Sequence, residues 1–482
     1  MFILEYVLLN ITKKYRYMST EIFDLVIIGA GPAGYTAAIR AAQLGMKVAC
    51  VEKNSTLGGT CLNVGCIPSK ALLHYSEKYF EARKYFNDWG IETDAKLNLS
   101  KMLSKKDKIV SDLCKGIEGL FAKNKVTTIK GLAEIIENNK VSVDNMGEKK
   151  IFTAKNILIA TGSSVAELPH IKYDEEQILS STGALLISSV PKKLIVIGAG
   201  YIGLELGSVW SRLGAEVTVI EYGDCILPFV DSDISGILKK SLEKQNIKFQ
   251  FNTKLEKIDK EKDKVIATIS QNNNNSFLEA DKILIAVGRV PNTLDLGLQN
   301  IGVNCDKGGR IIVNNKYQTS LNNIYAVGDV ISGPMLAHKA EEEAIAAVEN
   351  IAGKYGIVHY NIIPSVIYTD PEIASVGATE KELQAKSVNY KIGKFPFLAN
   401  SRARAISQTD GLVKILADSI TDEILGAHII GSSAGNLISE ISVGMSFRAA
   451  AEDLSMVCRP HPTLSEAIKE AALDISKKAI NF

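Results

Sequence analysis

The amino-acid sequence predicts an α/β protein, and one repeated pattern carries most of that prediction. The segments 24–52 and 193–221 share the same order: an apolar strand, a glycine-rich turn, a helix and a second strand that ends on an acid. They align without a gap, because the first glycines (198 − 29) and the final acids (221 − 52) both lie 169 residues apart. Two such strand–helix–strand repeats indicate two parallel sheets covered by helices.

Length and charge limit the possible functions. At about 150 residues per domain, a chain of 482 residues should form three or four domains. Its 55 basic and 54 acidic side chains give a net charge of +1, so nothing indicates a nucleic-acid surface or a polybasic membrane contact. We therefore expect small-molecule chemistry, with no nucleic acid and no membrane span.

The cysteines and the N-terminus indicate a compartment. Of seven cysteines only Cys61 and Cys66 are close in sequence, which is not the framework of a secreted protein. The apolar start is too short to span a bilayer, and basic residues follow it, the wrong order for a secretory signal. Because Met18 precedes the first strong strand, we interpret residues 1–22 as an N-terminal extension. Residues 1–17 would be dispensable or an over-long start, and a targeting segment is the alternative. A cytoplasmic location follows.

In the first repeat, Gly29, Gly31 and Gly34 form the pattern of a dinucleotide-binding turn. The first two permit a tight turn and close approach to a pyrophosphate, and the third lets the helix pack on the strand. The helix N-terminus then faces the negative charge, and Glu52 is placed to accept hydrogen bonds from ribose hydroxyls. Such a pattern alone often marks only a strand-to-helix turn, but here the strands, helix and acid are all present.

The second repeat carries Gly198, Gly200 and Gly203 in the same pattern. Its final acid, Glu221, would repel the 2′-phosphate of NADP, and the next residue is Tyr222 rather than an arginine. NAD is therefore favoured over NADP. Two such sites suggest two dinucleotides that pass electrons between them.

Local patterns predict the remaining elements. In chain order we expect a charged helical stretch over 77–123, alternating strands over 126–159, further strands broken by an asparagine loop at 272–275, a closing strand at 283–287, a returning strand within 319–330, a helix over 337–350, and mixed strands and helices from 359 onward.

Directly after the first repeat the chain reads LGGTCLNVGCIPSK, from residue 57 to residue 70. Cys61 and Cys66 would point about 140° apart on a regular helix, so a bridge between them needs a distorted turn. Gly65 and Pro68 make that distortion plausible, and a distorted disulphide is readily reduced. The alternatives are two inert buried cysteines or half of a metal site. The metal reading lacks a second cysteine or histidine cluster, so no metal is expected, and the position favours redox chemistry.

The segment GGTCLNVGCIPSK resembles the active-site signature of the pyridine nucleotide-disulphide oxidoreductases. The similarity runs from about Phe23 to the C-terminus. Besides both repeats it includes ATG at 160–162, AVGRVPNT at 286–293, AVGD at 326–329 and HPTLSE at 461–466.

This resemblance implies an α/β fold with two Rossmann-like dinucleotide-binding domains, one for FAD and one for NAD, plus an α+β C-terminal dimerisation domain. The implied boundaries are 23–162 for the first part of the FAD-binding domain with the redox cysteines, 163–290 for the NAD-binding domain, 291–358 for the second part of the FAD-binding domain, and 359–482 for the dimerisation domain.

The resemblance also implies roles at matching positions. Cys66 would be the thiol nearest the flavin, and Cys61 the thiol that meets the substrate. Lys70 would lie near flavin N5, paired with Glu205, although both residues otherwise look like ordinary solvated helix residues. Asp329 would bond the ribityl chain of FAD. The implied FAD contacts are Gly29, Gly31, Gly34, Glu52, Lys53, Gly59, Thr60, Lys70, Thr161, Gly162, Asp329 and Ala337. The implied NAD contacts are Gly198, Gly200, Tyr201, Gly203, Glu221, Val287 and Gly288.

His461 has two possible readings. Locally, Thr463 looks like a helix N-cap and Glu466 like the partner that completes a capping box, which leaves His461 as a loop residue. In the family, the matching His and Glu form a dyad that reaches the cysteines across a dimer interface. Thiol exchange needs such a base, because the attacking species is a thiolate. The resemblance therefore predicts a homodimer in which His461 is the base.

The substrate follows by comparison within the family. Relatives that reduce glutathione, trypanothione, thioredoxin or mercuric ion mostly use NADPH, against which Glu221 argues. No cysteine follows Cys458, so the chain has no additional C-terminal cysteine pair to pass electrons onward. An uncharged dihydrolipoyl arm remains, oxidised with NAD⁺ and carried by an acyltransferase of a 2-oxoacid dehydrogenase complex or by the glycine-cleavage H protein.

Three alternatives stay open: another flavin disulphide reductase that uses NADH or NADPH, a nicotinamide transhydrogenase or diaphorase with idle cysteines, and a silent flavin-binding scaffold. Thiol dependence separates them from the favoured activity. A silent scaffold has no need for a cysteine pair together with a base.

Overall fold

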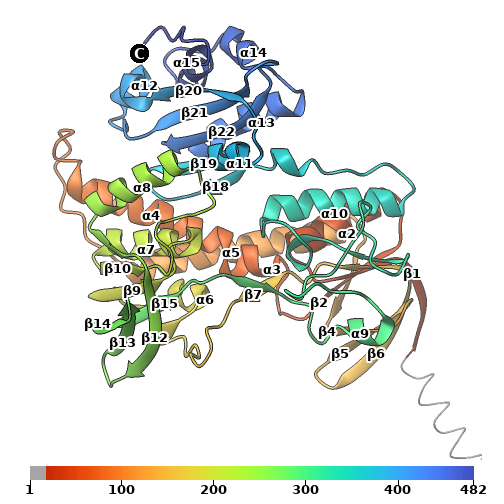
Figure 1. Cartoon of the computed structure of the whole chain (residues 1–482). Helices are drawn as coiled ribbons and strands as arrows, with labels where there is room; N and C mark the ends of the chain where they lie inside the picture. Colours follow the sequence, from red (N-terminus) through yellow and green to blue (C-terminus); the bar gives the residue numbers. More distant parts are fainter. Residues whose placement is uncertain (1–17) are drawn as a thin grey trace, which may run out of the picture. The chain divides into compact units, whose positions relative to one another are not determined.

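The computed structural model describes residues 18–482 (Figure 1). The extension predicted for residues 1–17 lies outside the described residues. The chain divides into two compact units. Unit 1 contains the residues up to 68 together with 104–166 and 288–358, and unit 2 contains 69–103, 167–287 and 359–482.

Unit 1 is built on a seven-stranded sheet in the order β3-β2-β1-β6-β5-β4, and β17 pairs with residues 157–159 at the end of β6. The strands β1, β2, β3, β6 and β17 run parallel, whereas β4, β5 and β6 form an antiparallel meander. The bounds are β1 Met18–Ile28, β2 Val48–Glu52, β3 Thr127–Lys130, β4 Leu132–Glu137, β5 Lys140–Asn145, β6 Glu148–Ile159 and β17 Ile324–Ala326.

Two helices of unit 1 lie side by side, α2 (Pro32–Gln43) and α10 (Ala337–Ile351) (Figure 1). The buried face of α2 consists of alanine and glycine, which lets this helix approach strand β1 closely. The other elements are α3 Gly59–Val64, α9 Leu298–Ile301, the 3₁₀ turn η1 Gly328–Val330, and the two-stranded pair β7 Ser163–Val165 and β16 Arg289–Pro291. The remaining long helices, α4 Cys66–Lys84 and α5 Leu99–Lys123, each include residues assigned to both units.

Unit 2 contains the second parallel sheet, in the order β11-β10-β9-β15-β8, and a three-stranded antiparallel sheet. The parallel strands are β8 Ile178–Leu179, β9 Lys193–Ile197, β10 Glu216–Ile220, β11 Ile247–Gln250 and β15 Lys282–Ile285. The antiparallel strands are β12 Thr253–Lys260, β13 Val265–Gln271 and β14 Asn274–Ala280. The helices are α6 Ser181–Ala184, α7 Tyr201–Leu213 and α8 Ser232–Lys244.

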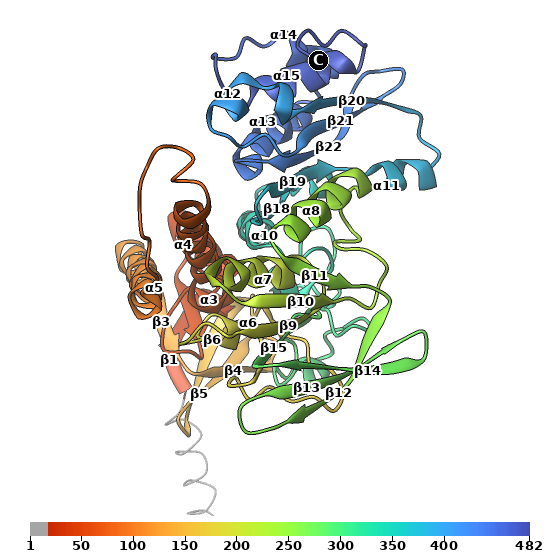
Figure 2. The ribbon, with the colours of Figure 1, turned by 90° about the vertical axis from the view of Figure 1, so that its left-hand side faces the viewer.

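The C-terminal segment of unit 2 forms an antiparallel sheet in the order β18-β19-β22-β21-β20, on which helices α13 and α15 pack (Figure 2). Its strands are β18 Ser365–Ile367, β19 Glu372–Gly377, β20 Tyr390–Pro396, β21 Leu412–Asp418 and β22 Ile424–Gly431. The helical elements are η2 Tyr360–Ile362, α11 Glu380–Ala385, η3 Phe397–Ala399, α12 Ser401–Ala405, α13 Ala434–Ser446, α14 Ala451–Met456 and α15 Glu466–Asp474.

The structure refines several predicted elements. The stretch 77–123 is two helices, because residues 85–98 separate α4 from α5. The asparagine loop is a two-residue hairpin turn in which Asn272 and Asn273 both have positive φ, 50° and 63°, a conformation that asparagine tolerates. The strand expected within 319–330 is shorter than predicted, because the chain turns into η1 at Gly328.

Across residues 18–482, no helix combines the length and the apolar character that crossing a membrane requires.

Candidate active site

The first glycine-rich turn is sterically closed to side chains. Gly29 has a φ of +101°, and a Cβ there would lie 2.4 Å from the carbonyl oxygen of Ala160. A Cβ on Gly34 would lie 1.8 Å from the carbonyl oxygen of Gly29, so the helix can meet the turn only if Gly34 has no side chain. Gly31 is the N-cap of α2, next to Gly59, and α2 begins at Pro32. The turn therefore offers a helix N-terminus that bulky groups of the protein do not cover.

Glu52 braces this turn. Its Oε2 accepts the backbone N–H of Ala30 at 2.9 Å, and its Oε1 accepts the backbone N–H and the side-chain N–H of Asn54 at 2.8 and 2.9 Å. A carboxylate offers about four lone-pair sites, so one remains for a ribose hydroxyl. A cavity of about 340 Å³ opens beside Glu52. Its lining residues are Glu52, Asn54, Ser55, Leu57, Glu118, Phe121, Ala122, Val126, Thr128 and Lys130. The open helix N-terminus and the remaining lone pair of Glu52 suit the pyrophosphate and a ribose of a dinucleotide such as FAD.

The second glycine-rich turn in unit 2 has the same form. Gly198 has a φ of +102°, and a Cβ on Gly203 would lie 2.2 Å from the carbonyl oxygen of Gly198. Gly200 precedes Tyr201, the first residue of α7, and a Cβ on Gly200 would meet nothing within 4 Å. This open space is where a pyrophosphate can approach the backbone.

Glu221 repeats the bracing seen at Glu52. Its Oε2 accepts the N–H of Ala199 at 2.7 Å and its Oε1 accepts the N–H of Gly223 at 2.7 Å. Val287 and Gly288, the other predicted NAD contacts, follow β15 after one intervening residue and are exposed.

The cysteine segment is a broken helix. Cys61 lies in α3, which ends at Val64, and Cys66 is the first residue of α4. Gly65 between them has φ −140° and ψ −114°, and a Cβ there would lie 2.9 Å from the carbonyl oxygen of Thr60. Pro68 does not cause the break, because it lies in the first turn of α4, where proline is tolerated. Gly65 therefore provides the distortion that the spacing of the cysteines requires.

Asn63 holds this broken helix in place, a role that the sequence reading missed. Its amide donates to the carbonyl oxygens of Leu57 and Gly59 at 3.0 and 2.9 Å, and its Oδ1 accepts the hydroxyl of Thr56 at 2.8 Å. Gly59 has a φ of +57° and a Cβ there would lie 2.5 Å from Gly31 Cα. Of the neighbouring predicted FAD contacts, Lys53 and Thr60 are exposed. In the sequence, the only indication of the role of Asn63 was the position of an asparagine between the two cysteines.

Lys70 and Glu205 form the ion pair that the resemblance implies. Lys70 Nζ lies 2.7 Å from Glu205 Oε2, and Glu205 is only 3% exposed. The other oxygen, Glu205 Oε1, accepts the backbone N–H of Tyr368 at 3.0 Å, and Lys70 Nζ lies 4.7 Å from the centre of the Tyr368 ring. The local reading of Glu205 as a solvated helix residue was wrong. Tyr368, which fixes both members of the pair, was not predicted.

Asp329 lies in the turn η1 of unit 1. Its Oδ2 accepts the hydroxyl of Ser163, whose own oxygen accepts Nε of Arg289 at 2.8 Å. Arg289 also donates through Nη2 to the carbonyl oxygen of Ser163 at 2.6 Å. Neither Ser163 nor Arg289 was predicted as a site residue, although Arg289 belongs to the AVGRVPNT motif.

The ATG motif at 160–162 is hydrogen-bonded to the AVGRVPNT motif at 286–293. The hydroxyl of Thr161 donates to the carbonyl oxygen of Asn292 at 2.6 Å, and the N–H of Asn292 donates to the carbonyl oxygen of Gly162 at 2.9 Å. Ala337, the last predicted FAD contact, is the first residue of α10.

His461 and Glu466 form a dyad at the start of α15. Nδ1 of the exposed His461 lies 2.9 Å from Glu466 Oε1, and Glu466 Oε2 accepts the N–H of Thr463 at 2.8 Å. Burial alone would raise the pKa of Glu466, but the Thr463 N–H and His461 hold that pKa below its usual value. The capping-box reading was wrong, because α15 begins at Glu466 with Ser465 as its N-cap. With Nδ1–H bonded to the carboxylate, Nε2 of His461 carries the lone pair of a base.

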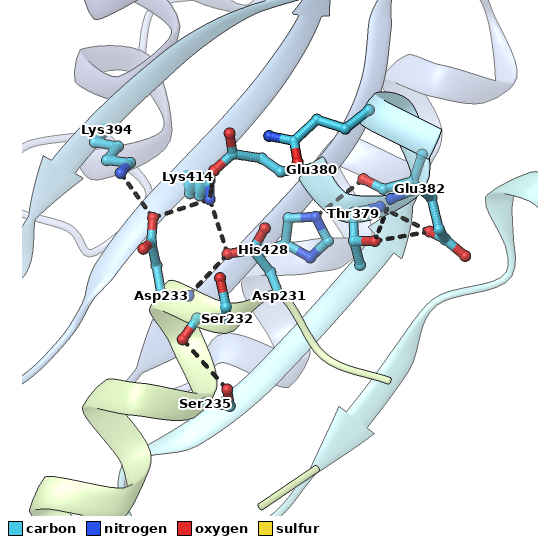
Figure 3. A network of polar contacts seen from close by, with 12 residues as sticks. Asp231, Ser232, Asp233, Ser235, Thr379, Glu380, Glu382, Lys394, Lys414 and His428 are labelled. Atoms are coloured by element: carbon cyan, nitrogen blue, oxygen red, sulfur yellow. Dashed lines mark hydrogen bonds and ion pairs between the residues drawn. The ribbon is translucent and has the colours of Figure 1, made fainter. Parts of the chain in front are cut away.

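Elsewhere in unit 2, three acids come close enough to hold a cation (Figure 3). One ligand oxygen from each of Asp231, Asp233 and Glu380 lies within 4.8 Å of the others. The ammonium of Lys414 bonds to all three carboxylates, so a lysine supplies the positive charge at this cluster.

Comparison with known proteins gives the family. The pyridine nucleotide-disulphide oxidoreductase family matches residues 23–344, and its dimerisation domain matches residues 363–472. The chain belongs to this family. Dihydrolipoyl dehydrogenase 1, mitochondrial, of Arabidopsis thaliana is 54% identical to it over 98% of this chain and 94% of the relative. The mitochondrial dihydrolipoyl dehydrogenase of Dictyostelium discoideum is 53% identical over 97% of each chain. The crystal structure of LpdA from Mycobacterium tuberculosis matches with a TM-score of 0.88 at 27% identity, over 93% of this chain and 98% of that one.

These matches confirm the predicted family, the fold class and the cofactors FAD and NAD, and the dimerisation domain supports a homodimer. The predicted cytoplasmic location is wrong, because relatives from Arabidopsis, pea and Dictyostelium are named as mitochondrial proteins. The argument failed because scattered cysteines and the lack of a secretory signal pattern argue only against secretion, not against an organelle.

Proposed function

We propose that this chain oxidises a protein-bound dihydrolipoyl group to the lipoyl disulphide and reduces NAD⁺ to NADH, with FAD bound in unit 1. The activity agrees with the names of near full-length relatives at 50–54% identity. The observation that carries the residue assignment is the broken helix at Gly65, which presents Cys61 and Cys66 directly downstream of the first dinucleotide turn.

The proposed exchange uses two cysteines and one base. In the oxidised enzyme, Cys61 and Cys66 would be joined by a disulphide. Nε2 of His461 takes a proton from one substrate thiol, and the resulting thiolate attacks Sγ of Cys61, which breaks the bond to Cys66 and releases Cys66 as a thiolate. The second substrate thiol then displaces Cys61 and closes the lipoyl disulphide, which leaves both cysteines reduced. The chemistry that bound FAD supplies is the transfer of this electron pair, as hydride, to NAD⁺.

Glu466 and the pair of Lys70 and Glu205 have supporting roles in this proposal. Glu466 holds Nδ1 of His461, which fixes the tautomer with its lone pair on Nε2 and stabilises the imidazolium that forms. Glu205 is buried and bonded to the Tyr368 backbone, so it fixes the direction of the Lys70 ammonium. That fixed positive charge would favour electron-rich states at the flavin.

The domain assignment belongs to the same proposal. Residues 23–162 and 291–358 would hold FAD, residues 163–290 would hold NAD, and residues 359–482 would form the dimer. The base would come from the other subunit, since a two-fold dimer builds two equal sites from two chains. The partner would be a lipoyl-bearing acyltransferase of a 2-oxoacid dehydrogenase complex or the glycine-cleavage H protein.

Cysteine variants test the exchange. Cys61→Ser and Cys66→Ser should each abolish dihydrolipoamide oxidation while the purified protein keeps its FAD and still reduces a dye with NADH. Retained lipoamide turnover in either variant would show that the cysteines are idle, as in a diaphorase or transhydrogenase. Loss of both activities together with FAD would instead indicate that the fold had been damaged.

Subunit mixing tests the source of the base. His461→Gln should slow the dithiol half-reaction by about 10²–10⁴, the usual contribution of a positioned base, and leave the NADH-to-flavin step nearly unchanged. Heterodimers of Cys61→Ser and His461→Gln chains should regain one working site in two. If verified heterodimers stay inactive, the base does not act across the subunit interface.

A further inference from the structure

Helix α10 of unit 1 carries a buried ion pair that the proposed reaction does not use. Lys339 and Glu343 are 1% and 0% exposed and lie one helical turn apart. Lys339 Nζ lies 3.0 Å from Glu343 Oε1 and 3.1 Å from Glu343 Oε2. Burying two charges costs several kcal/mol per ion in real proteins, and an apolar pair of similar volume is often as stable. The pair therefore calls for a role other than stabilising the core.

The contacts of the pair indicate this role, because both charges bond to the backbone of Gly328. Glu343 Oε2 accepts the N–H of Gly328 at 2.8 Å, and Lys339 Nζ donates to the carbonyl oxygen of Gly328 at 3.3 Å. Gly328 has a φ of +80°, and a Cβ there would lie 3.2 Å from Cβ of Ala340 on the same helix. One ion pair thus bonds both polar groups of a buried residue in the left-handed region, and the Gly328 carbonyl oxygen also accepts the N–H of Ile331 at 3.2 Å.

Gly328 begins the turn η1, and the next residue is Asp329. The backbone of this turn is held from α10, whereas the Asp329 carboxylate is held from β7 through Ser163. The loop that follows η1 also covers the lysine, since a Cβ on Gly333 would lie 2.9 Å from Cε of Lys339. The direction of Asp329 is therefore fixed at both its backbone and its side chain.

We propose that Lys339 and Glu343 are positioning residues for FAD. They hold the Gly328 backbone so that the Asp329 carboxylate stays aimed at the flavin's ribityl hydroxyls. The inference rests on the proposed contact between Asp329 and FAD. A prealigned carboxylate binds without first paying the entropy of ordering its turn, so the effect should appear in the retention of FAD.

The test measures the rate at which the purified dimer releases FAD, followed by the rise in free flavin fluorescence. Lys339→Met keeps the length of the side chain and removes the bond to the Gly328 carbonyl. We expect release to be at least about tenfold faster, the lower end of what the loss of an outer-shell partner costs at metal sites. The matched control is Lys239→Met on α8. Lys239 also pairs with an acid four residues later, Glu243 at 2.7 Å, but that pair is exposed, so the variant should leave the rate unchanged.

A second variant separates positioning from simple destabilisation. Glu343→Gln is nearly isosteric and leaves Lys339 charged and buried without its counter-charge, so the apoprotein should unfold at a lower temperature. Adding Lys339→Met removes that lone charge and should restore much of the unfolding temperature, while FAD release stays fast. If FAD retention recovers together with the unfolding temperature, the pair is only a structural element and the inference is overturned.

The parallel variant Asp329→Ala distinguishes this inference from the proposed FAD contact. Fast release from Asp329→Ala with a wild-type rate from Lys339→Met would overturn the positioning role alone. A wild-type rate from Asp329→Ala would show that the proposed contact is wrong, and the positioning role would fail with it. Fast release from both variants supports the inference.

Discussion

The buried ammonium of Lys414 in unit 2 makes a contribution to the free energy of unfolding that can be predicted (Figure 3). The side chain is 0% exposed in the middle of β21, and its Nζ lies 2.8 Å from Asp231 Oδ1 and 2.9 Å from Asp233 Oδ2. It also bonds to Glu380 at the start of α11. Because Asp231 is the N-cap of α8, a single ammonium joins that helix to the C-terminal sheet.

The perturbation is Lys414→Met, which keeps the stem and removes the charge. It leaves the buried carboxylate of Asp231 without its lysine and close to two other carboxylates, of which Asp233 still pairs with Lys394. Removing one partner of a buried pair typically costs about 3–5 kcal/mol, so we expect a loss of that size in the free energy of unfolding. The matched control is Lys394→Met: Lys394 Nζ lies 2.7 Å from the same Asp233 but its side chain is 41% exposed. This variant should cost no more than about 1 kcal/mol.

The assay is unfolding in urea, followed by circular dichroism at two protein concentrations so that dimer dissociation is separated from unfolding. Burial alone would lower the pKa of Lys414, but its three carboxylate partners raise that pKa to about 12. The stability it contributes is therefore complete below its unfolded pKa near 10.5 and is lost only as the pH rises toward 12. The deficit should be constant between pH 7 and 9. A loss in Lys414→Met as small as that in Lys394→Met would refute the reasoning.

The remaining predictions concern NAD, pH and a glycine. Glu221→Ala should weaken NAD⁺ binding by about 1–3 kcal/mol in calorimetry, through unpaired buried partners, and a wild type that already prefers NADP⁺ would contradict the assignment. Burial lowers the pKa of His428 in the folded protein. Below about pH 6.5 the unfolded chain therefore binds a proton at this residue that the folded protein does not bind. The free energy of unfolding should fall by up to about 1.4 kcal/mol per pH unit as the pH drops further. His428→Gln should remove that slope, and equal slopes in urea titrations would exclude it. Gly34→Ala should prevent FAD retention, because its Cβ would lie 1.8 Å from a carbonyl oxygen, whereas Gly116→Ala, with nothing within 4 Å, should leave it intact; an absorbance spectrum decides.

The parts of the fold that could be predicted are those imposed by local sterics. Gly34 and Gly203 are required because a carbonyl oxygen lies close to where a Cβ would be. The glycine pattern of both repeats could therefore be recognised in the sequence. The helix 337–350 and the asparagine hairpin at 272–275 were visible for similar reasons, since periodicity and turn chemistry act over a few residues.

The parts that could not be predicted depend on contacts between distant segments. Lys70 bonds to Glu205, 135 residues away in the sequence, and Lys414 bonds to Asp231, 183 residues away. In sequence each looks like a solvated charge, and only the packing of elements shows that Glu205 and Lys414 are buried. The local interpretation of Glu466 failed for a different reason. Glu466 lies three residues after Thr463, the spacing of a capping box, and its bond to His461, five residues away, has no sequence signature of its own.

The two acids that end the repeats show how one residue can serve both the fold and the ligand. Each carboxylate accepts a backbone N–H of its turn on one oxygen and an N–H from two residues downstream on the other. Both oxygens must therefore be acceptors, and an amide would bring its own NH₂ group against one of those donors. The turn itself thus requires an acid, before any ribose is bound. In the proposed NAD site, the same atoms would place a negative charge against the 2′-phosphate of NADP. We therefore propose that the geometry that holds the turn at Glu221 also favours NAD over NADP.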